Sequence, residues 1–103
     1  TLKQAVKRLN QEPDEAKALI QNALGFALAA QKDYEGAVRH YKLALRAKKD
    51  YPVALNNLAF AQQKLLADEE AINLYKKTLA LEPNNKTAQQ GLKKLEKRQK
   101  RSS

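Results

Sequence analysis

An internal repeat of 34 residues constrains this chain more than any other feature of its sequence. When residues 18–51 are laid over residues 52–85 without a gap, nine positions are identical. The identical pairs are Asn22/Asn56, Leu24/Leu58, Phe26/Phe60, Ala27/Ala61, Glu35/Glu69, Ala37/Ala71, Tyr41/Tyr75, Lys42/Lys76 and Leu45/Leu79. This period is typical of a helix-turn-helix unit, which buries its apolar face only by stacking on a neighbour. The sequence therefore predicts a stack of helix pairs.

The spacing of apolar residues predicts an all-α fold. Apolar side chains recur every three or four residues, and the alternating runs that indicate strands are missing. Pro13 can open a helix in its first turn, where a missing N–H costs nothing. Asp33, Asp50 and Asp68 are candidate N-caps, because a short carboxylate can accept the free amide hydrogens of a starting helix. We expect about six antiparallel helices, at residues 2–11, 14–31, 34–48, 52–65, 69–81 and 85–99.

The composition argues against catalysis. The chain has no Cys, which excludes disulfides, thiolate nucleophiles and most structural zinc sites. His40 is the single histidine and is interpreted as a surface residue, and the two serines are the last two residues. The acidic run 68–70 lies at a predicted helix start, where carboxylates stabilise the helix dipole. We expect no enzyme activity, no cofactor, no metal and no small-molecule substrate.

The net charge of +9 is concentrated at one end. Residues 86–103 carry seven Lys or Arg and one Glu, whereas residues 52–85 are nearly neutral. This basic tail contains Lys93, Lys94, Lys97, Arg98, Lys100 and Arg101. It has three interpretations: a solvated face of a capping helix, contact with an acidic protein or an anionic membrane, or nucleic-acid binding. The absence of interleaved aromatic residues, which would stack on bases, argues against the third.

No apolar run is long enough to span a membrane, and no signal peptide is recognisable. The chain starts at Thr1 and contains no Met, so we expect a fragment of a longer protein. A membrane anchor or targeting segment would then lie outside the sequence.

The repeated residues resemble the tetratricopeptide repeat family. In residues 52–85 the resemblance rests on Leu55, Leu58-Ala59, Ala71, Tyr75, Thr78, Leu79 and Pro83. In residues 18–51 it rests on Leu24-Gly25, Asp33-Tyr34, Ala37, Tyr41, Ala44 and Leu45. Gln21 departs from the family at its bulky position, Lys49 at the usual proline and Thr78 at the second alanine. In this family, small residues such as Gly25 let helices approach closely.

The resemblance implies a solenoid with four parts. Residues 1–17 form an N-terminal flanking helix and linker, in which Val6 and Leu9 are apolar. Residues 18–51 and 52–85 form two repeats. Residues 86–103 form a capping helix with the basic tail, packed through Leu92 and Leu95. Because residues 2–11 are a poor repeat, apolar surface could remain exposed at that end and allow self-association.

The resemblance also implies a concave, partner-binding groove lined by the first helix of each repeat. Its positions here are Leu19, Asn22, Phe26, Ala29, Val53, Asn56, Asn57, Phe60, Gln63, Lys64, Thr87, Gln90 and Lys94. Asn side chains could bond the backbone of a peptide segment or helix of another protein. Phe26 and Phe60 have two interpretations: an apolar shelf for partner side chains, or packing between helices.

One subclass of the family clamps a C-terminal carboxylate with Lys, Asn and Arg. Asn57 matches one clamp position, but Asn22, Phe26, Thr87 and Gly91 stand where the others would be needed, so a clamp is not expected.

The run Tyr51–Phe60, followed by a basic helix after Pro83-Asn84-Asn85, is similar to the tetratricopeptide assembly factors for photosystem I. That similarity implies a protein-interaction scaffold on the cytoplasmic or chloroplast stromal side, associated with a membrane in the full-length protein. The alternative function is an adaptor that binds nucleic acid or an anionic surface through the basic C-terminal helix.

Overall fold

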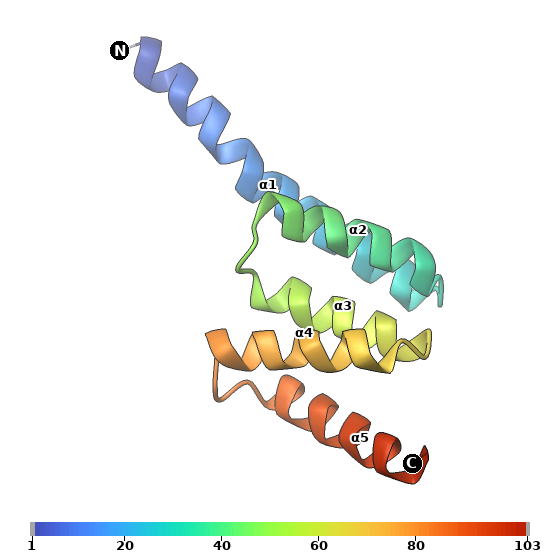
Figure 1. Cartoon of the computed structure of the whole chain (residues 1–103). Coiled ribbons are helices and arrows are strands. Elements are labelled where there is room, and N and C mark those ends of the chain that lie inside the picture. Colours follow the sequence, from blue (N-terminus) through green and yellow to red (C-terminus); the bar gives the residue numbers. More distant parts are fainter. Residues whose placement is uncertain (1, 103) are drawn as a thin grey trace.

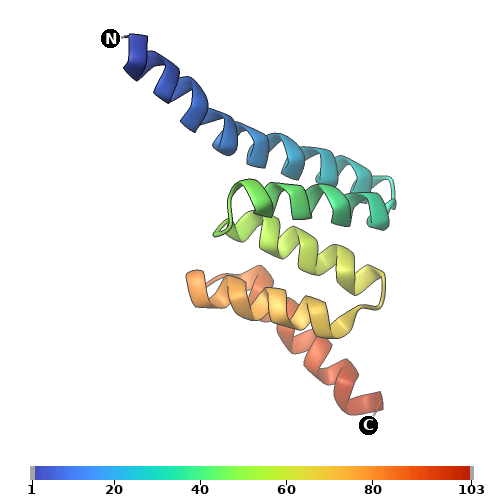
Figure 2. The same ribbon diagram turned by 45° about the horizontal axis from the view of Figure 1, so that its top comes forward.

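The computed structural model describes the backbone of residues 2–102 and the side chains of residues 14–101. Within this part the chain forms five helices and no strand: α1 (Leu2–Ala30), α2 (Tyr34–Ala47), α3 (Pro52–Lys64), α4 (Asp68–Leu81) and α5 (Lys86–Ser102). Consecutive helices pack side by side and stack in chain order, so α1 and α5 lie at opposite ends (Figure 1). The turned view shows the same order (Figure 2). The predicted all-α solenoid is confirmed.

The predicted break at Pro13 is wrong, because α1 runs without interruption from Leu2 to Ala30. An interior proline removes one hydrogen-bond donor and crowds the carbonyl four residues earlier, but α1 continues through it. The N-terminal part of α1 extends beyond the stack (Figure 1). The expected packing of Val6 and Leu9 lies outside the described side chains. The other helix ends agree with the predicted ones to within three residues.

The turns that close the two helix pairs have the same conformation. Lys32 and Leu66, which are 34 residues apart, are the only non-glycine residues with positive φ between residues 2 and 102, at 67° and 64°. In each turn a backbone N–H reaches back across the helix end, from Asp33 to the Leu28 carbonyl at 2.8 Å and from Ala67 to the Gln62 carbonyl at 2.9 Å. These bonds satisfy carbonyls that would otherwise lack a partner.

Of the three predicted N-caps, one is correct. The Asp33 carboxylate accepts the Gly36 N–H at 3.0 Å and caps α2. Asp50 is not a cap, because Tyr51 holds that position before Pro52. Asp68 lies inside α4 and bonds Arg98 instead. The missed cap is Asn85, whose side-chain oxygen accepts the Ala88 N–H at 3.0 Å at the start of α5.

Two apolar clusters, one per repeat junction, replace a single central core. The first joins α2 to α3 through Ala37, Tyr41, Leu58 and Ala61. The second joins α3, α4 and α5 through Ala59, Ala71, Ile72, Tyr75, Ala88 and Leu95. The expected close approach at Gly25 is observed, since a Cβ there would lie 2.6 Å from the Tyr41 ring. This linear series of junctions is typical of a solenoid.

Candidate protein-binding groove

The first helices of the pairs lie next to one another: α1 contacts α3, and α3 contacts α5. This arrangement brings together Asn22, Phe26 and Ala29 of α1 with Asn57 and Phe60 of α3. These five residues are among those predicted to line the groove, and the structure brings them together.

Phe26 and Phe60 both line one small pocket. The pocket encloses about 180 Å³ and is lined by Phe26, Ala29, Ala30, Tyr41, Asn57 and Phe60. Phe26 is 63% exposed and Phe60 is 46% exposed, so neither ring is packed in the core. The Lys64 ammonium lies 5.4 Å from the centre of the Phe60 ring, within the range of a cation–π contact. The exposed fractions of Phe26 and Phe60 favour an apolar shelf for partner side chains over packing between helices.

The rim of this pocket carries a bonded pair of amides. The Asn57 side chain donates to the Asn22 side-chain oxygen at 3.0 Å and so links α3 to α1. Both residues are partly exposed. Because each amide has four hydrogen-bonding positions and this bond uses one of each, both can still bond a partner's backbone.

Two predicted groove residues are engaged elsewhere. Asn56 donates to the Asn85 side-chain oxygen at 2.9 Å, and its own oxygen is buried without a partner, so it fixes the start of α5. Gln63 is buried and accepts the Tyr75 hydroxyl at 3.2 Å. Both residues lie on α3, which packs against other helices on two sides. Their side chains therefore bond residues of neighbouring elements instead of facing the groove. Both predictions are therefore corrected.

The remaining groove residues surround the pocket without joining it. Leu19 lies beside Lys48 and Tyr51, at the other end of the first repeat. Val53 is exposed on α3. Thr87, Gln90 and Lys94 are exposed on α5, two helices after α3 in the stack. Ala30 and Tyr41 line the pocket but were not predicted; Ala30 follows Phe26 by four residues, which is the signal that could have identified it.

The basic tail is not a uniform free surface. Arg98 bonds Asp68 through both nitrogens it presents, with the Nε–Oδ2 distance at 2.8 Å, and so fastens α5 to the start of α4. The hydrogen bond to Asp68 raises the pKa of Arg98 above its usual range. Lys93, Lys97, Lys100 and Arg101 are exposed. Arg98 therefore has a structural role, and the others remain candidates for contact with an anionic partner.

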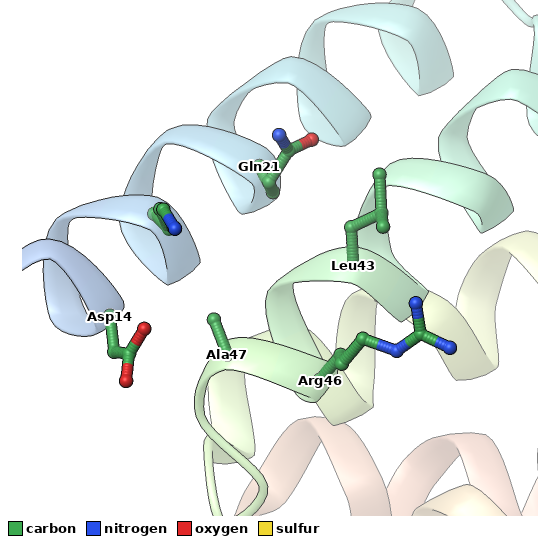
Figure 3. A pocket seen from close by; sticks show the side chains of 6 residues that line it. Asp14, Gln21, Leu43, Arg46 and Ala47 are labelled. Atoms are coloured by element: carbon green, nitrogen blue, oxygen red, sulfur yellow. The ribbon is translucent and has the colours of Figure 1, made fainter.

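A second pocket, of about 280 Å³, lies between α1 and α2 and is lined by Asp14, Lys17, Gln21, Leu43, Arg46 and Ala47 (Figure 3). The Arg46 guanidinium points away from Asp14, so the charged groups do not converge on one point (Figure 3). Gln21 accepts a hydrogen bond from His40 Nδ1 at 2.6 Å. His40 is therefore a contact between helices, and the interpretation as a surface residue was wrong.

Other chemistry finds little support in the described part of the chain. Among the side chains of residues 14–101, no three His, Asp or Glu gather to hold a metal ion. None of the helices within residues 2–102 combines the length and apolar character needed to cross a membrane. Burial raises the pKa of Tyr41 and Tyr75 above their ordinary value of 10.0, and Tyr75 donates to Gln63. Both phenols are packing residues of the junctions.

The sequence and the fold both match known proteins. The family profile described as tetratricopeptide repeat matches residues 28–95. A ycf37 protein of Cyanophora paradoxa is 39% identical over 79 residues, covering 77% of this chain and 46% of the relative. The chloroplastic tetratricopeptide repeat domain-containing protein PYG7 of Arabidopsis thaliana is 29% identical over 87 residues, covering 84% of this chain and 29% of the relative. The chain spans less than half the length of these relatives.

Two solved structures of tetratricopeptide repeat domains also match the fold of this chain. The second TPR domain of human RPAP3, determined in complex with an HSP70 peptide, has a TM-score of 0.74 and 28% identity. The match covers 77% of this chain and 66% of that chain. The first TPR of Spaghetti, bound to an HSP90 peptide, has a TM-score of 0.55 and 24% identity. That match covers 85% of this chain and 95% of the Spaghetti chain. The second likeness shows the fold alone.

Proposed function

The chain belongs to the tetratricopeptide repeat family, and we propose that it is a scaffold that binds a segment of another protein between α1 and α3. The observation that carries this proposal is the pocket that Phe26 and Phe60, two exposed rings one repeat apart, both line. Exposed aromatic rings beside a pocket are typical anchors of protein interfaces.

The dimensions of the pocket support a protein partner over a small molecule. Small-molecule sites typically enclose roughly 300–1,000 Å³, whereas this pocket encloses about 180 Å³. That volume suits one apolar side chain. Asn22 and Asn57 stand beside it with free hydrogen-bonding positions for a backbone, and Lys64 adds a positive charge. We therefore expect an apolar anchor residue in the partner, with carbonyl or carboxylate oxygens on either side of it.

The finer proposal is that this scaffold serves the assembly of a membrane protein complex such as photosystem I. Its support is the similarity of the run Tyr51–Phe60 and the following basic helix to assembly factors of that complex. The Arabidopsis thaliana relative is described as chloroplastic, which supports a stromal location. The exposed lysines of α5 could hold the scaffold near an anionic membrane surface.

The test is a pull-down from a source lysate with the chain and its Phe26→Ala/Phe60→Ala variant. We expect the variant to lose the partner, because the substitutions truncate both aromatic side chains that line the pocket. The matched control is Leu43→Ala/Leu66→Ala, which removes two exposed apolar side chains outside the pocket and should retain the partner. Circular dichroism should show the same helix content in all forms.

The alternative function is binding of nucleic acid or an anionic surface through the basic tail. A third variant, Lys97→Gln/Lys100→Gln/Arg101→Gln, distinguishes it from binding in the groove. Phosphate binding weakens steeply with salt, whereas an apolar groove does not. If the partner is lost with this variant and with moderate salt, but not with the two Phe substitutions, the groove proposal is wrong. Mass spectrometry of the captured fraction then tests the finer proposal, which requires subunits or assembly intermediates of a membrane complex.

A further inference from the structure

The outward side of α2 carries three cations around an exposed leucine. Arg39, Lys42 and Arg46 follow one another at spacings of three and four residues, so they share one side of the helix. Leu43 lies beside them and is 43% exposed. All four residues are exposed and together line a hollow of about 410 Å³. We call these four residues the outer patch.

The repeat does not require this cluster. The buried positions of the two second helices carry the same residues, as at Tyr41 and Tyr75. The outer patch differs from its counterpart on α4, where Leu43 is matched by a lysine. The counterpart residues, which are also exposed, are Asn73, Lys76, Lys77 and Ala80. The outer patch is therefore specific to the first repeat and does not follow from helix packing.

The cations of the outer patch lack a counter-charge from their own chain. Among the described side chains, none of the three lies within ion-pair distance of an acidic group. Acidic residues occur only at its edges: Glu35 lies one turn before Arg39 at the start of α2, and Asp14 lines the adjoining pocket. The Arg46 guanidinium points away from Asp14 (Figure 3). The outer patch therefore favours an anionic ligand and its edges disfavour one.

These edges limit the size of the ligand. Arg39 and Arg46 are seven residues apart, which is about 10 Å along the helix axis. Roughly three residues of an extended chain span this length. A membrane surface or a nucleic-acid backbone continues further and would place phosphates against Glu35 and Asp14. A short acidic segment of a protein fits between these two carboxylates.

Leu43 indicates an apolar residue within that segment. It lines the hollow of the outer patch and also the pocket of about 280 Å³ between α1 and α2. A purely electrostatic contact gains nothing from an exposed leucine, whereas an apolar side chain of the partner would bury it. A small molecule fits less well, because small-molecule sites bury most of their ligand and the hollow is lined by one helix alone.

We propose that the outer patch binds an acidic segment of a partner protein. An apolar residue of the segment packs on Leu43, and carboxylates on either side of it pair with Arg39 and Arg46, whose guanidinium groups bind carboxylates through two parallel hydrogen bonds. This surface is separate from the groove. Tyr41 lines the groove pocket, and Arg39, two residues earlier, points to nearly the opposite side of α2. One copy of the chain can therefore hold two partners at once.

The test uses a labelled peptide with one Leu between two pairs of Glu, measured by fluorescence anisotropy. Arg39→Gln/Arg46→Gln should weaken its binding about tenfold, because two charge-assisted pairs are lost. The matched control is Lys76→Gln/Lys77→Gln, which removes the same charge from the outward side of α4. It should change the binding less than about twofold, because salt screens charges that do not touch the peptide. Circular dichroism should show the same helix content in all forms.

A substitution at the centre of the outer patch separates an apolar contact from simple charge attraction. Leu43→Lys introduces the residue that α4 has at this position and adds a positive charge. It should nevertheless weaken the peptide about threefold or more, because the apolar contact is lost. Leu43→Ala/Leu66→Ala, the control of the groove test, should weaken it too. Tighter binding by Leu43→Lys would show that the outer patch attracts charge alone and would overturn the proposal.

The location of the peptide is tested by amide chemical shifts in NMR spectra, which should change along the outward side of α2. Phe26→Ala/Phe60→Ala should leave peptide binding unchanged, so the groove and the outer patch can fail independently. Loss of the peptide with this variant, or no shift change on α2, would overturn the proposal. Vesicles of phosphatidylcholine and phosphatidylserine are the second probe. If vesicles bind through Arg39 and Arg46 and the peptide does not, the ligand is a membrane surface and the proposal is wrong.

Discussion

The two helix pairs contain the same residues at matching positions but bury them to different depths. α3 lies between α2 on one side and α4 and α5 on the other, whereas no helix within residues 2–102 covers one side of α1. Leu58 is consequently buried and Leu24 is not, although they are the same residue in the same repeat position. In a solenoid the place of a unit in the stack, more than its sequence, determines how much each apolar residue stabilises the fold.

The largest effect is expected from removing α5, which leaves the second helix pair with one uncovered side, as in the first pair. A chain that ends at Asn85 lacks α5 and loses the buried Ala88 and Leu95. We expect its melting temperature to fall by about 15 °C or more, since burying two or three apolar side chains contributes several kcal/mol. Thermal unfolding followed by circular dichroism measures this.

The matched control for this truncation is a chain that ends at Gln99, which keeps both buried residues and removes the last four. Its melting temperature should change little. If the chain ending at Asn85 melts at the temperature of the intact chain, α5 does not cap the stack.

Next in size is the pair of substitutions Leu58→Ala and Leu24→Ala. We expect Leu58→Ala to lower the free energy of unfolding by about 2–5 kcal/mol, because it leaves a cavity between α2 and α3. Leu24→Ala should cost less than about 1 kcal/mol in the monomer, because its side chain is already partly in water. Urea unfolding at low protein concentration measures both. Equal losses would mean that the two positions have the same environment.

A polar pair distinguishes the first helix pair from the second. Gln21 and His40 bond one another where the second repeat has Leu55 and Leu74. Gln21→Leu alone should cost about 0.5–1.5 kcal/mol, because His40 loses its acceptor. The double variant Gln21→Leu/His40→Leu should recover that loss or exceed the original stability, since replacing both partners restores the apolar contact. A double variant less stable than the single one would show that the bond has no apolar equivalent.

The sequence predicted the repeat and the helix type because these depend on local spacing. Through the resemblance to the tetratricopeptide repeat family, the sequence also placed Phe26 and Phe60 at matching positions of neighbouring first helices. It could not predict the roles of Asn56 and Gln63, because their partners Asn85 and Tyr75 lie on other elements. The wrong N-cap at Asp68 has the same cause, because Asp68 bonds Arg98, which is 30 residues away. Long-range polar contacts follow from packing, which a residue pattern does not contain.

The smallest effect is expected from substitutions in the turns that close the two helix pairs. It should be equal in both, because the two turns have the same conformation. Lys32 and Leu66 both adopt positive φ, which strains residues other than glycine. Lys32→Gly and Leu66→Gly should each raise the free energy of unfolding by about 0.5 kcal/mol, since the relief of strain exceeds the added entropy of the unfolded chain. Ala80→Gly, on the exposed side of α4, is the control and should lower it by about 1 kcal/mol. Because both turns close their own helix pair, neither depends on a neighbour in the stack. A gain at one turn and not at the other would mean that the stack acts on the turns as well as on the apolar faces.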